Sequence, residues 1–504
     1  MRLSSKIAVM TSSEQALHQR IIELEQQLSQ VNARNRYLEE QFRLAQQKQF
    51  GKSCEGFTGQ GELFNEAEEV AETVVEEEKQ DISYSRNKPK RKPLPTDLPR
   101  EVVVHDLTDE EKVCDCCNGE LHKIGEDKAE KLEFIPAQVK VIEHVRPKYA
   151  CRQCEKLGTQ NTIKQAPVPL GPIPKGIATA SLLSQLITSK YQYGLPLYRQ
   201  ESLFKQYGIE LSRQTMSDWM IKSAKLFQAL YDRLRAELLE QSVIQADETT
   251  VKVVKSDKTQ NYMWVYCTGA DAPVVNHPIP NIVLFDYQPS RAGRCPVDFL
   301  RGHSGYLHVD GYQAYEQTEA TLVGCWAHAR RKFVEAKQVQ GKSKSGKADM
   351  ALSFIQKLYG LETKIKNKSA DEKYEIRQQQ AKPIIEKLHG WLTKQNVLPK
   401  TKLGEATTYL SNQWHKLVCY LEDGQLSIDN NRAERAIKPF VIGRKNWLFS
   451  QTANGANASA VLYSIIETAK ANGLTPFDYL MTCLTALCQP EPSIDAILPW
   501  NIKR

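Results

Sequence analysis

Three carboxylates in separate segments of the chain have the residue type and the setting of a metal centre. Asp247 lies in a strand-like run at 242–253 that ends in polar residues. Asp310 closes a second apolar run, and Glu434 lies at a predicted helix start. Carboxylate oxygens are hard ligands that suit Mg²⁺, and two such ions about 3.5–4 Å apart can activate one phosphodiester oxygen and stabilise another. The pattern predicts a two-Mg²⁺ phosphodiester enzyme whose catalytic residues and metal ligands are Asp247, Asp310 and Glu434.

Two of these acids have structural alternatives. Asp247 and Glu248 are adjacent on a predicted strand, so they point to opposite faces and only one can face the metals. A solvated strand end would also explain Asp247. The segment from Asn431 to Glu434 has the spacing of a helix capping box, and Glu434 could pair with Lys438 one turn later. A helix start could therefore place Glu434 for structural reasons alone.

Basic residues and a tryptophan follow Glu434 closely. Cationic side chains contact phosphates, and an indole ring can stack on a base. The alternative is a solvated basic face with no ligand. The predicted DNA-binding residues of this segment are Arg435, Lys438, Arg444, Lys445 and Trp447.

The segment 429–449, DNNRAERAIKPFVIGRKNWLF, resembles the signature of the insertion-sequence-66 family of bacterial DDE transposases. Segments 246–249, 308–312 and 324–333 are similar to other blocks of that family. The resemblance implies cleavage at a transposon end, which frees a 3′-hydroxyl, and then attack of that hydroxyl on target DNA. It implies two Mg²⁺ ions, which Mn²⁺ can replace, and selects Asp247, Asp310 and Glu434 as the triad. One departure is Lys438 in place of arginine, which keeps the charge but loses the planar fork.

The pattern of residues 241–455 predicts an α/β domain. Apolar runs alternate with turn residues, and helical stretches follow near 291–301 and 326–337. With acids on the first and fourth strands, this order fits a ribonuclease-H-like catalytic core. A helical insertion at 338–425 interrupts the core, and a C-terminal helical region at 456–504 follows it. The predicted strands are 242–254, 261–268, 281–287, 304–310 and 321–325.

Two Cys-x-x-Cys pairs occur in the segment 101–165. Four thiolates suit a closed tetrahedral Zn²⁺ site, and the family resemblance also implies a zinc-finger-like domain here. Cys116 lies between the two cysteines of the first Cys-x-x-Cys pair and could replace one of them as a ligand. The alternative to a metal site is that these cysteines are free thiols. The predicted ligands of one structural Zn²⁺ are Cys114, Cys117, Cys151 and Cys154.

Cys325 and His328 follow the fifth predicted strand. They could form half of a metal site. A buried cysteine beside a hydrogen-bonded histidine is the favoured interpretation, in which His328 orients a neighbouring group.

The N-terminal segment 12–50 has a leucine-zipper-like heptad pattern, which predicts a coiled coil and a homodimer or higher oligomer. Asn35 lies at a core position, where a buried asparagine sets the register. A lone amphipathic helix packed on its own chain is the alternative. The two sets of heptad positions are Leu17, Leu24, Val31, Leu38 and Ala45, and Ile21, Leu28, Asn35, Phe42 and Gln49.

Two further segments precede the core. Residues 51–100 lack apolar periodicity and carry acidic and then basic runs, which predicts a disordered linker. Residues 175–240 are helical in pattern and resemble a helix-turn-helix, with Gly208 in the turn and Ser212 as the N-cap of the second helix. Arg213 and Gln214 would then contact DNA. Any helical hairpin has a similar pattern, so ordinary packing is the alternative.

The composition permits DNA binding and indicates a cytoplasmic protein. The chain has 504 residues and a formal net charge of +7, with no secretory signal at its start. It lacks the run of about 18 apolar residues that a membrane span requires. The expected partners are transposon-end DNA, target DNA and small accessory proteins of the same element. Two other functions fit: a zinc-containing DNA-binding protein with an inactive core, and a nuclease that cuts without joining.

Overall fold

The computed structural model describes residues 101–102, 138–149, 163–270, 279–339 and 346–502, with most positions between 18 and 42. Residues 77–166 form one compact unit, and the rest of the chain forms another. In the smaller unit β1 (Lys148–Tyr149) pairs antiparallel with β2 (Lys164–Gln165). The described positions between 18 and 42 are helical. The predicted linker and the cysteines at 114, 116, 117, 151 and 154 lie outside the described residues.

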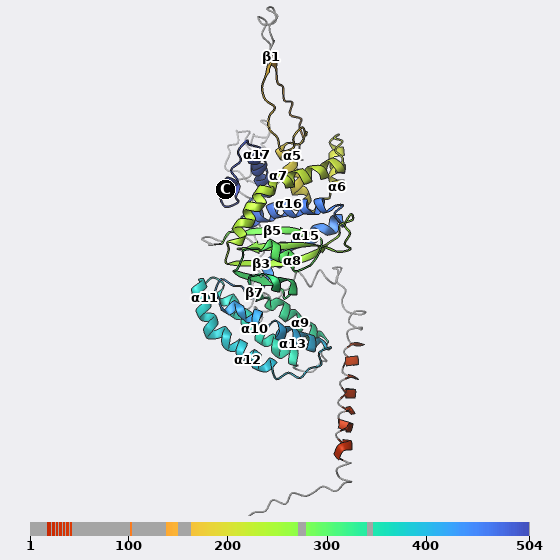
Figure 1. Cartoon of the computed structure of the whole chain (residues 1–504), viewed down its shortest axis with the longest axis vertical. Helices are drawn as coiled ribbons and strands as arrows, with labels where there is room; N and C mark the ends of the chain where they lie inside the picture. The colour runs from red at the N-terminus through yellow and green to blue at the C-terminus, as the bar shows by residue number, and fades with distance from the viewer. Residues whose placement is uncertain are drawn as a thin grey trace, which may run out of the picture. The chain divides into compact units, whose positions relative to one another are not determined.

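A mixed five-stranded sheet forms the centre of the larger unit (Figure 1). Its order is β5-β4-β3-β6-β7, with antiparallel pairing among β3, β4 and β5 and parallel pairing of β3 with β6 and β6 with β7. All five predicted strands are confirmed to within a few residues. Their bounds are β3 (Val243–Val251), β4 (Asn261–Thr268), β5 (Ile282–Gln288), β6 (Tyr306–Val309) and β7 (Thr321–Gly324).

One face of the sheet is covered by α7 (Arg213–Leu239), α15 (Asn431–Trp447) and α16 (Ala453–Ala471). The α16 hydroxyls complete the hydrogen bonding of the edge strand β5. Ser464 Oγ accepts from the N–H of Phe285 at 2.7 Å, and Thr468 Oγ1 accepts from the N–H of Val283 at 3.0 Å. Side-chain partners at a sheet edge block pairing with another strand, so β5 is closed on its outer side.

Short elements lie around this core. On the other face Phe299 of α8 (Arg294–Phe299) stacks on Tyr266, with ring centroids 3.9 Å apart. Tyr315 of the 3₁₀ turn η1 (Gln313–Gln317) packs edge-on against Trp264. The chain closes with α17 (Pro476–Leu487) and η4 (Asp495–Ile497). None of the helices in the described part of the chain is long and apolar enough to cross a membrane.

The helix-turn-helix pattern corresponds to two helices that precede the sheet. After α5 (Ala180–Tyr191), α6 (Leu197–Gln206) is joined to α7 by a turn in which Gly208 has a φ of 73°. Ser212 begins α7 as the predicted N-cap, because its Oγ accepts from the N–H of Thr215 at 3.1 Å. The later part of α7 is buried in the core, so this helix also supports the sheet.

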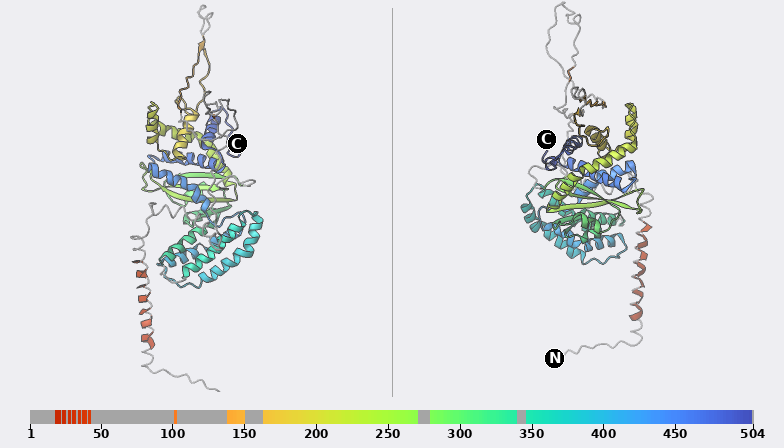
Figure 2. Two further views of the ribbon diagram at one scale, coloured as in Figure 1. Left: turned by 180° about the vertical axis from the view of Figure 1, so that it is seen from behind. Right: turned by 45° about the horizontal axis from the view of Figure 1, so that its top comes forward.

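Residues 346–425 are mostly helical, as the pattern of 338–425 predicted, and residues 340–345 lie outside the described residues. These helices pack with α9 (Trp326–Gln338) around a second cluster of buried apolar residues, beyond the β7 side of the sheet (Figure 2). These helices therefore form a layer whose core also contains side chains of α9, β3 and β7. Its elements are α10 (Lys347–Ile365), α11 (Ala370–Ile376), the π-helical turn η2 (Arg377–Ala381), α12 (Lys382–Leu392), α13 (Lys402–Asn412), α14 (Trp414–Val418) and η3 (Cys419–Leu421).

Candidate active site

The register of the parallel pair β3–β6 places Asp247 and Asp310 side by side. Gln245 pairs with His308, and each acid lies two residues further along its own strand direction. Side chains two residues apart share a face of the sheet, so the two carboxylates lie at the same end of the pair. Gly311, with a φ of 103°, turns the chain directly after Asp310.

Cross-strand pairing also decides which face Asp247 occupies. Asp247 pairs with Val265, and Val265 pairs with Phe285. Paired residues point to the same face, and the ring of Phe285 lies 6.1 Å from that of Phe440 in α15. Asp247 therefore faces the helix that carries Glu434.

Helix α15 is attached to the sheet through Asn430. The Nδ2 of this buried residue donates to the carbonyl of Ala246 at 2.8 Å. Asn430 is the N-cap residue and makes no side-chain capping bond, so Glu434 occupies the fourth helical position. The capping-box alternative is wrong, because it requires Glu434 at the third position.

The three carboxylates interact electrostatically. Burial raises the pKa of Asp247 well above its usual value, and the nearby charges of Glu248, Asp310 and Glu434 raise it further. A hydrogen bond from the N–H of Glu248 at 2.8 Å partly opposes this effect. Like charges in a poorly solvated site disfavour ionisation, and a bound cation would relieve that repulsion.

Glu248 points away from this centre, as the strand alternation predicted. It pairs with Trp264, on the opposite face from Asp247. Its carboxylate accepts from Arg291 Nε at 2.9 Å and from the hydroxyl of Tyr315 at 2.6 Å. Burial, followed by the charge of Asp310, raises the pKa of Glu248. Sequence reasoning missed Arg291 and Tyr315, because no local pattern links them to the strand.

Cys325 and His328 lie beside Glu434. Cys325 directly precedes α9, and its Sγ accepts from the N–H of Asn430 at 3.2 Å. His328 Nδ1 lies 3.6 Å from Glu434 Oε1, which is longer than a hydrogen bond. Burial, with the charge of Arg331, lowers the pKa of His328 to about 4, so the imidazole is neutral near pH 7. Cys325 is buried, as predicted, whereas His328 Nδ1 makes no hydrogen bond within the described residues.

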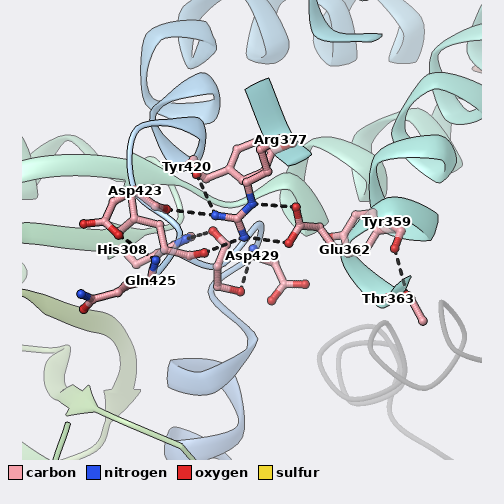
Figure 3. Close-up of polar contacts among 11 residues, drawn as sticks. His308, Tyr359, Glu362, Thr363, Arg377, Tyr420, Asp423, Gln425 and Asp429 are labelled. Carbon is pink, nitrogen blue, oxygen red and sulfur yellow. Dashed lines mark hydrogen bonds and ion pairs between the residues drawn. The ribbon is translucent and has the colours of Figure 1, made fainter. Parts of the chain in front are cut away.

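The loop that leads into α15 is held by the helical insertion (Figure 3). The buried Arg377 side chain pairs with Glu362 at 2.7 Å and 2.9 Å. The same guanidinium donates to the carbonyls of Tyr420, Asp423 and Leu426 at 3.1, 3.0 and 2.9 Å. One buried cation therefore satisfies two carbonyls of the loop and one of η3.

His308 of β6 fixes the next part of the loop. Its Nε2 lies 2.8 Å from the carbonyl of Ser427. Burial lowers the pKa of His308 to about 4, so a neutral ring donates this hydrogen bond near pH 7. Strand β6, which Asp310 directly follows, is thereby linked to the loop before α15.

The predicted DNA-binding residues of α15 differ in exposure. Arg435 and Lys445 are exposed, and Lys438 is half-buried. Arg444 Nη1 donates to Thr249 Oγ1 at 2.9 Å, which ties it to β3. Desolvation lowers the pKa of Arg444.

Trp447 packs within an aromatic group. Its ring lies 6.2 Å from that of Tyr191 and 6.3 Å from that of Tyr463, with Lys190 Nζ 4.0 Å from its centre. Phe449, two residues later, is 44% exposed and was missed by sequence reasoning. Leu448 between them has a φ of 64°, and the N–H of Phe449 bonds to the carbonyl of Trp447 at 2.7 Å. This bond closes a γ-turn, after which the side chain of Phe449 is exposed.

The other predicted DNA contacts lie at the start of α7. Arg213 and Gln214 are exposed in its first turn, whereas Met216 is buried. Gln214 Nε2 donates to Asp218 at 3.1 Å. The start of α7 therefore presents a polar surface beside a buried apolar side.

Four family models match the chain. The model described as "Transposase IS66 family" covers residues 175–458, which include all three acids and the helical insertion. The "zinc-finger binding domain of transposase IS66" covers 111–155 and spans the four predicted zinc ligands. "Transposase C of IS166 homeodomain" matches 37–103, and "IS66 C-terminal element" matches 464–500. The chain thus has a zinc-finger domain, which supports a bound Zn²⁺.

Long relatives occur in Sinorhizobium fredii (strain NBRC 101917 / NGR234). The "Uncharacterized protein y4hP" is 33% identical over 444 residues, which are 84% of this chain and 78% of the relative. The "Uncharacterized protein y4jD" is 34% identical over 426 residues, or 81% of each chain. The "Uncharacterized protein y4qI" is 33% identical over 459 residues, covering 86% of this chain and 83% of the relative. With the fold and the family models, these findings lead to one conclusion: the chain belongs to the IS66 family of transposases.

Proposed function

We propose that this transposase binds the ends of its insertion sequence and catalyses Mg²⁺-dependent DNA cleavage and strand transfer. Asp247, Asp310 and Glu434 are the proposed catalytic residues and Mg²⁺ ligands. The observation that carries this proposal is their convergence from β3, the end of β6 and α15, with mutual effects on the pKa of Asp247. If Asp247 had only a structural role, there would be no reason for two further acids from distant segments to lie beside it.

A ribonuclease-H-like core is part of the proposal. Three antiparallel strands followed by two parallel strands, in the order β5-β4-β3-β6-β7, support it. Asp247 lies on β3, the first strand of this sheet in chain order, Asp310 directly follows β6, the fourth, and Glu434 lies on a later helix.

The donor set fits Mg²⁺, because it consists of carboxylate oxygens that are partly buried and mutually repulsive. Bound metal ions would supply activation of the attacking oxygen and stabilisation of the leaving oxygen. The chain's own residues hold the carboxylates in place. Tyr312 donates its N–H to Asp310 Oδ1 at 2.8 Å, and the hydroxyl of Tyr409 in α13 donates to the Asp310 carbonyl at 2.6 Å. The insertion therefore orients the second acid as well as the loop before α15.

We assign DNA binding to two exposed surfaces. Arg435, Lys438, Arg444 and Lys445 would contact phosphates along α15, and Trp447 and the exposed Phe449 are the proposed base contacts. Arg213 and Gln214 would contact transposon-end DNA from the start of α7. The affinity should fall steeply with salt because cationic side chains displace counterions.

The N-terminal regions are assigned to assembly and metal binding. Cys114, Cys117, Cys151 and Cys154 are the proposed ligands of one structural Zn²⁺. Apolar heptad side chains are exposed in the single chain, among them Leu24 at 49% and Leu28 at 61%. A second copy would bury this stripe in a coiled-coil dimer. The dimer would act on bacterial nucleoid DNA, and small accessory proteins of the element are further proposed partners.

A cleavage and joining assay tests the function. The substrates are a labelled duplex carrying the terminal repeat of the chain's own element and a plasmid target. In Mg²⁺ the wild-type chain should cut and join, and Asp247→Asn should lose both activities by about 1000-fold, equivalent to roughly 4 kcal/mol. The matched control is Glu319→Gln, which neutralises an exposed acid soon after Asp310 and should retain activity. Cutting without joining would indicate a nuclease, and binding without cutting would indicate a DNA-binding factor.

A further inference from the structure

Three side chains of different chemistry converge beside the carboxylate centre. The Cys325 sulfur, one His328 ring nitrogen and a Glu434 carboxylate oxygen all lie within 4.8 Å of one another. Cys325 and His328 flank the first turn of α9, and Glu434 projects from the first turns of α15. A thiol and an imidazole are not ligands that Mg²⁺ selects, so this cluster is not explained by the proposed Mg²⁺ centre.

The spacing leaves room for an ion. Bond lengths of about 2.0–2.3 Å and tetrahedral angles place the ligand atoms of a zinc site roughly 3.3–3.6 Å apart. His328 Nδ1 and Glu434 Oε1 are 3.6 Å apart. Within the part of the chain that the structure describes, His328 Nδ1 makes no hydrogen bond. A hydrogen bond between the two side chains therefore does not explain why these two atoms lie so close together.

The surroundings also suit a metal ligand set. The N–H of Asn430 donates to the Cys325 sulfur at 3.2 Å, and such outer hydrogen bonds orient metal ligands and stabilise a thiolate. Cys325 is fully buried, whereas the His328 side chain is 22% exposed and that of Glu434 10%. The sulfur side of the cluster is buried and the imidazole side is partly exposed, so solvent water can reach the cluster from the imidazole side.

We propose that Cys325, His328 and Glu434 form a three-ligand site for a divalent transition metal, with Zn²⁺ the ion that suits these donors best. The site is separate from the zinc-finger cysteines. It shares Glu434 with the Mg²⁺ centre, so occupation by Zn²⁺ would withdraw that carboxylate and inhibit cleavage. Only this inhibitory consequence rests on the proposed function.

Cobalt spectroscopy tests the binding site without any catalytic readout. The full chain is first loaded with one equivalent of Zn²⁺ for the zinc-finger domain and is then titrated with Co²⁺. We expect a sulfur-to-cobalt absorption band and tetrahedral visible bands that saturate at one equivalent, because Co²⁺ bound by carboxylates alone gives no sulfur band. Both features should be lost in Cys325→Ser and His328→Gln. They should be retained in Cys419→Ser, which removes another buried cysteine with a carboxylate neighbour, Glu422.

Absence of the band from the wild-type chain, or the same band in both site variants, would overturn the proposal. His328→Gln keeps Cys325 and its packing, so it still decides the question if Cys325→Ser does not fold. In a separate cleavage assay, added Zn²⁺ should inhibit the wild-type chain at least about tenfold more than His328→Gln, each measured relative to its own activity in Mg²⁺. An inactive chain that still shows the cobalt band would contradict the proposed function and leave the metal site supported.

Discussion

Asn430 donates its side-chain amide to the carbonyl of Ala246 at 2.8 Å, which joins the residue before α15 to the residue before Asp247. The contact spans 184 positions of the chain and is buried. It fixes the start of the helix that carries Glu434 relative to the strand that carries Asp247. This side-chain hydrogen bond therefore helps to set the spacing of two of the three carboxylates.

Removal of this contact should reduce both stability and activity. Asn430→Ala leaves the buried Ala246 carbonyl without its partner, which should cost about 1–3 kcal/mol in the free energy of unfolding. Cleavage should fall further than the folded fraction does, because Glu434 loses its position. Denaturant unfolding and single-turnover cleavage measure the two effects. Asn501→Ala removes a similar but exposed bond, to the Asp495 carbonyl, and should change neither.

The carboxylate centre should destabilise the metal-free protein. Because burial and neighbouring charges raise the pKa of Asp247, its ionised form is unfavourable in the folded chain near pH 7. Asp247→Asn should raise the free energy of unfolding without metal by about 1–2 kcal/mol. Added Mg²⁺ should raise the Tm of the wild-type chain and should have a much smaller effect on the variant. Equal responses to Mg²⁺ in thermal unfolding would contradict Asp247 as a ligand.

The Arg377–Glu362 pair should be strongly coupled. Arg377→Met leaves the largely buried Glu362 carboxylate without its cation and removes the partner of three carbonyls, so the free energy of unfolding should fall by about 3–5 kcal/mol. The double variant Arg377→Met with Glu362→Leu should recover part of that loss, because no buried charge remains. Arg301→Met breaks an exposed pair with Asp298 and serves as the control, with no expected change. A single variant as stable as the wild type would show that the loop does not need this cation.

Lys190 should make stability depend on alkaline pH. Burial lowers its pKa from 10.5 to about 8, so the folded chain binds fewer protons than the unfolded chain between these values. Stability contributed by this site therefore rises as pH increases from 8 to 10.5, and the full cost of burying the charge is present below 8.

The measurement compares wild type with Lys190→Met. Methionine keeps an unbranched apolar stem beside Trp447 and removes the charge. The variant should be more stable by at most about 3 kcal/mol below pH 8, and its advantage should disappear toward pH 10.5. A difference that stays constant across this range would indicate that the ammonium group is well solvated or compensated by the aromatic rings.

The sequence by itself determined the strands, the helical layer and the family. Strands β3 to β7 coincide with apolar runs bounded by turn residues, because side chains that are buried in the sheet are mostly apolar. The sequence also predicted that Asp247 and Glu248 point to opposite faces of the sheet, because the alternation of side chains along one strand is a local property. The residues Gly208 and Ser212 predicted the turn and the start of α7, since backbone conformation and capping depend on residues a few positions apart.

Only the tertiary structure decided which distant groups meet. The sequence predicted that Cys325 and His328 lie close together, but their position beside Glu434 depends on how α9 and α15 pack on the sheet. Arg291 reaches Glu248 and Arg377 reaches the loop before α15 across segments with no shared periodicity. Such contacts depend on long-range packing and on the desolvation of charge, and both arise only when separate elements close around a common core.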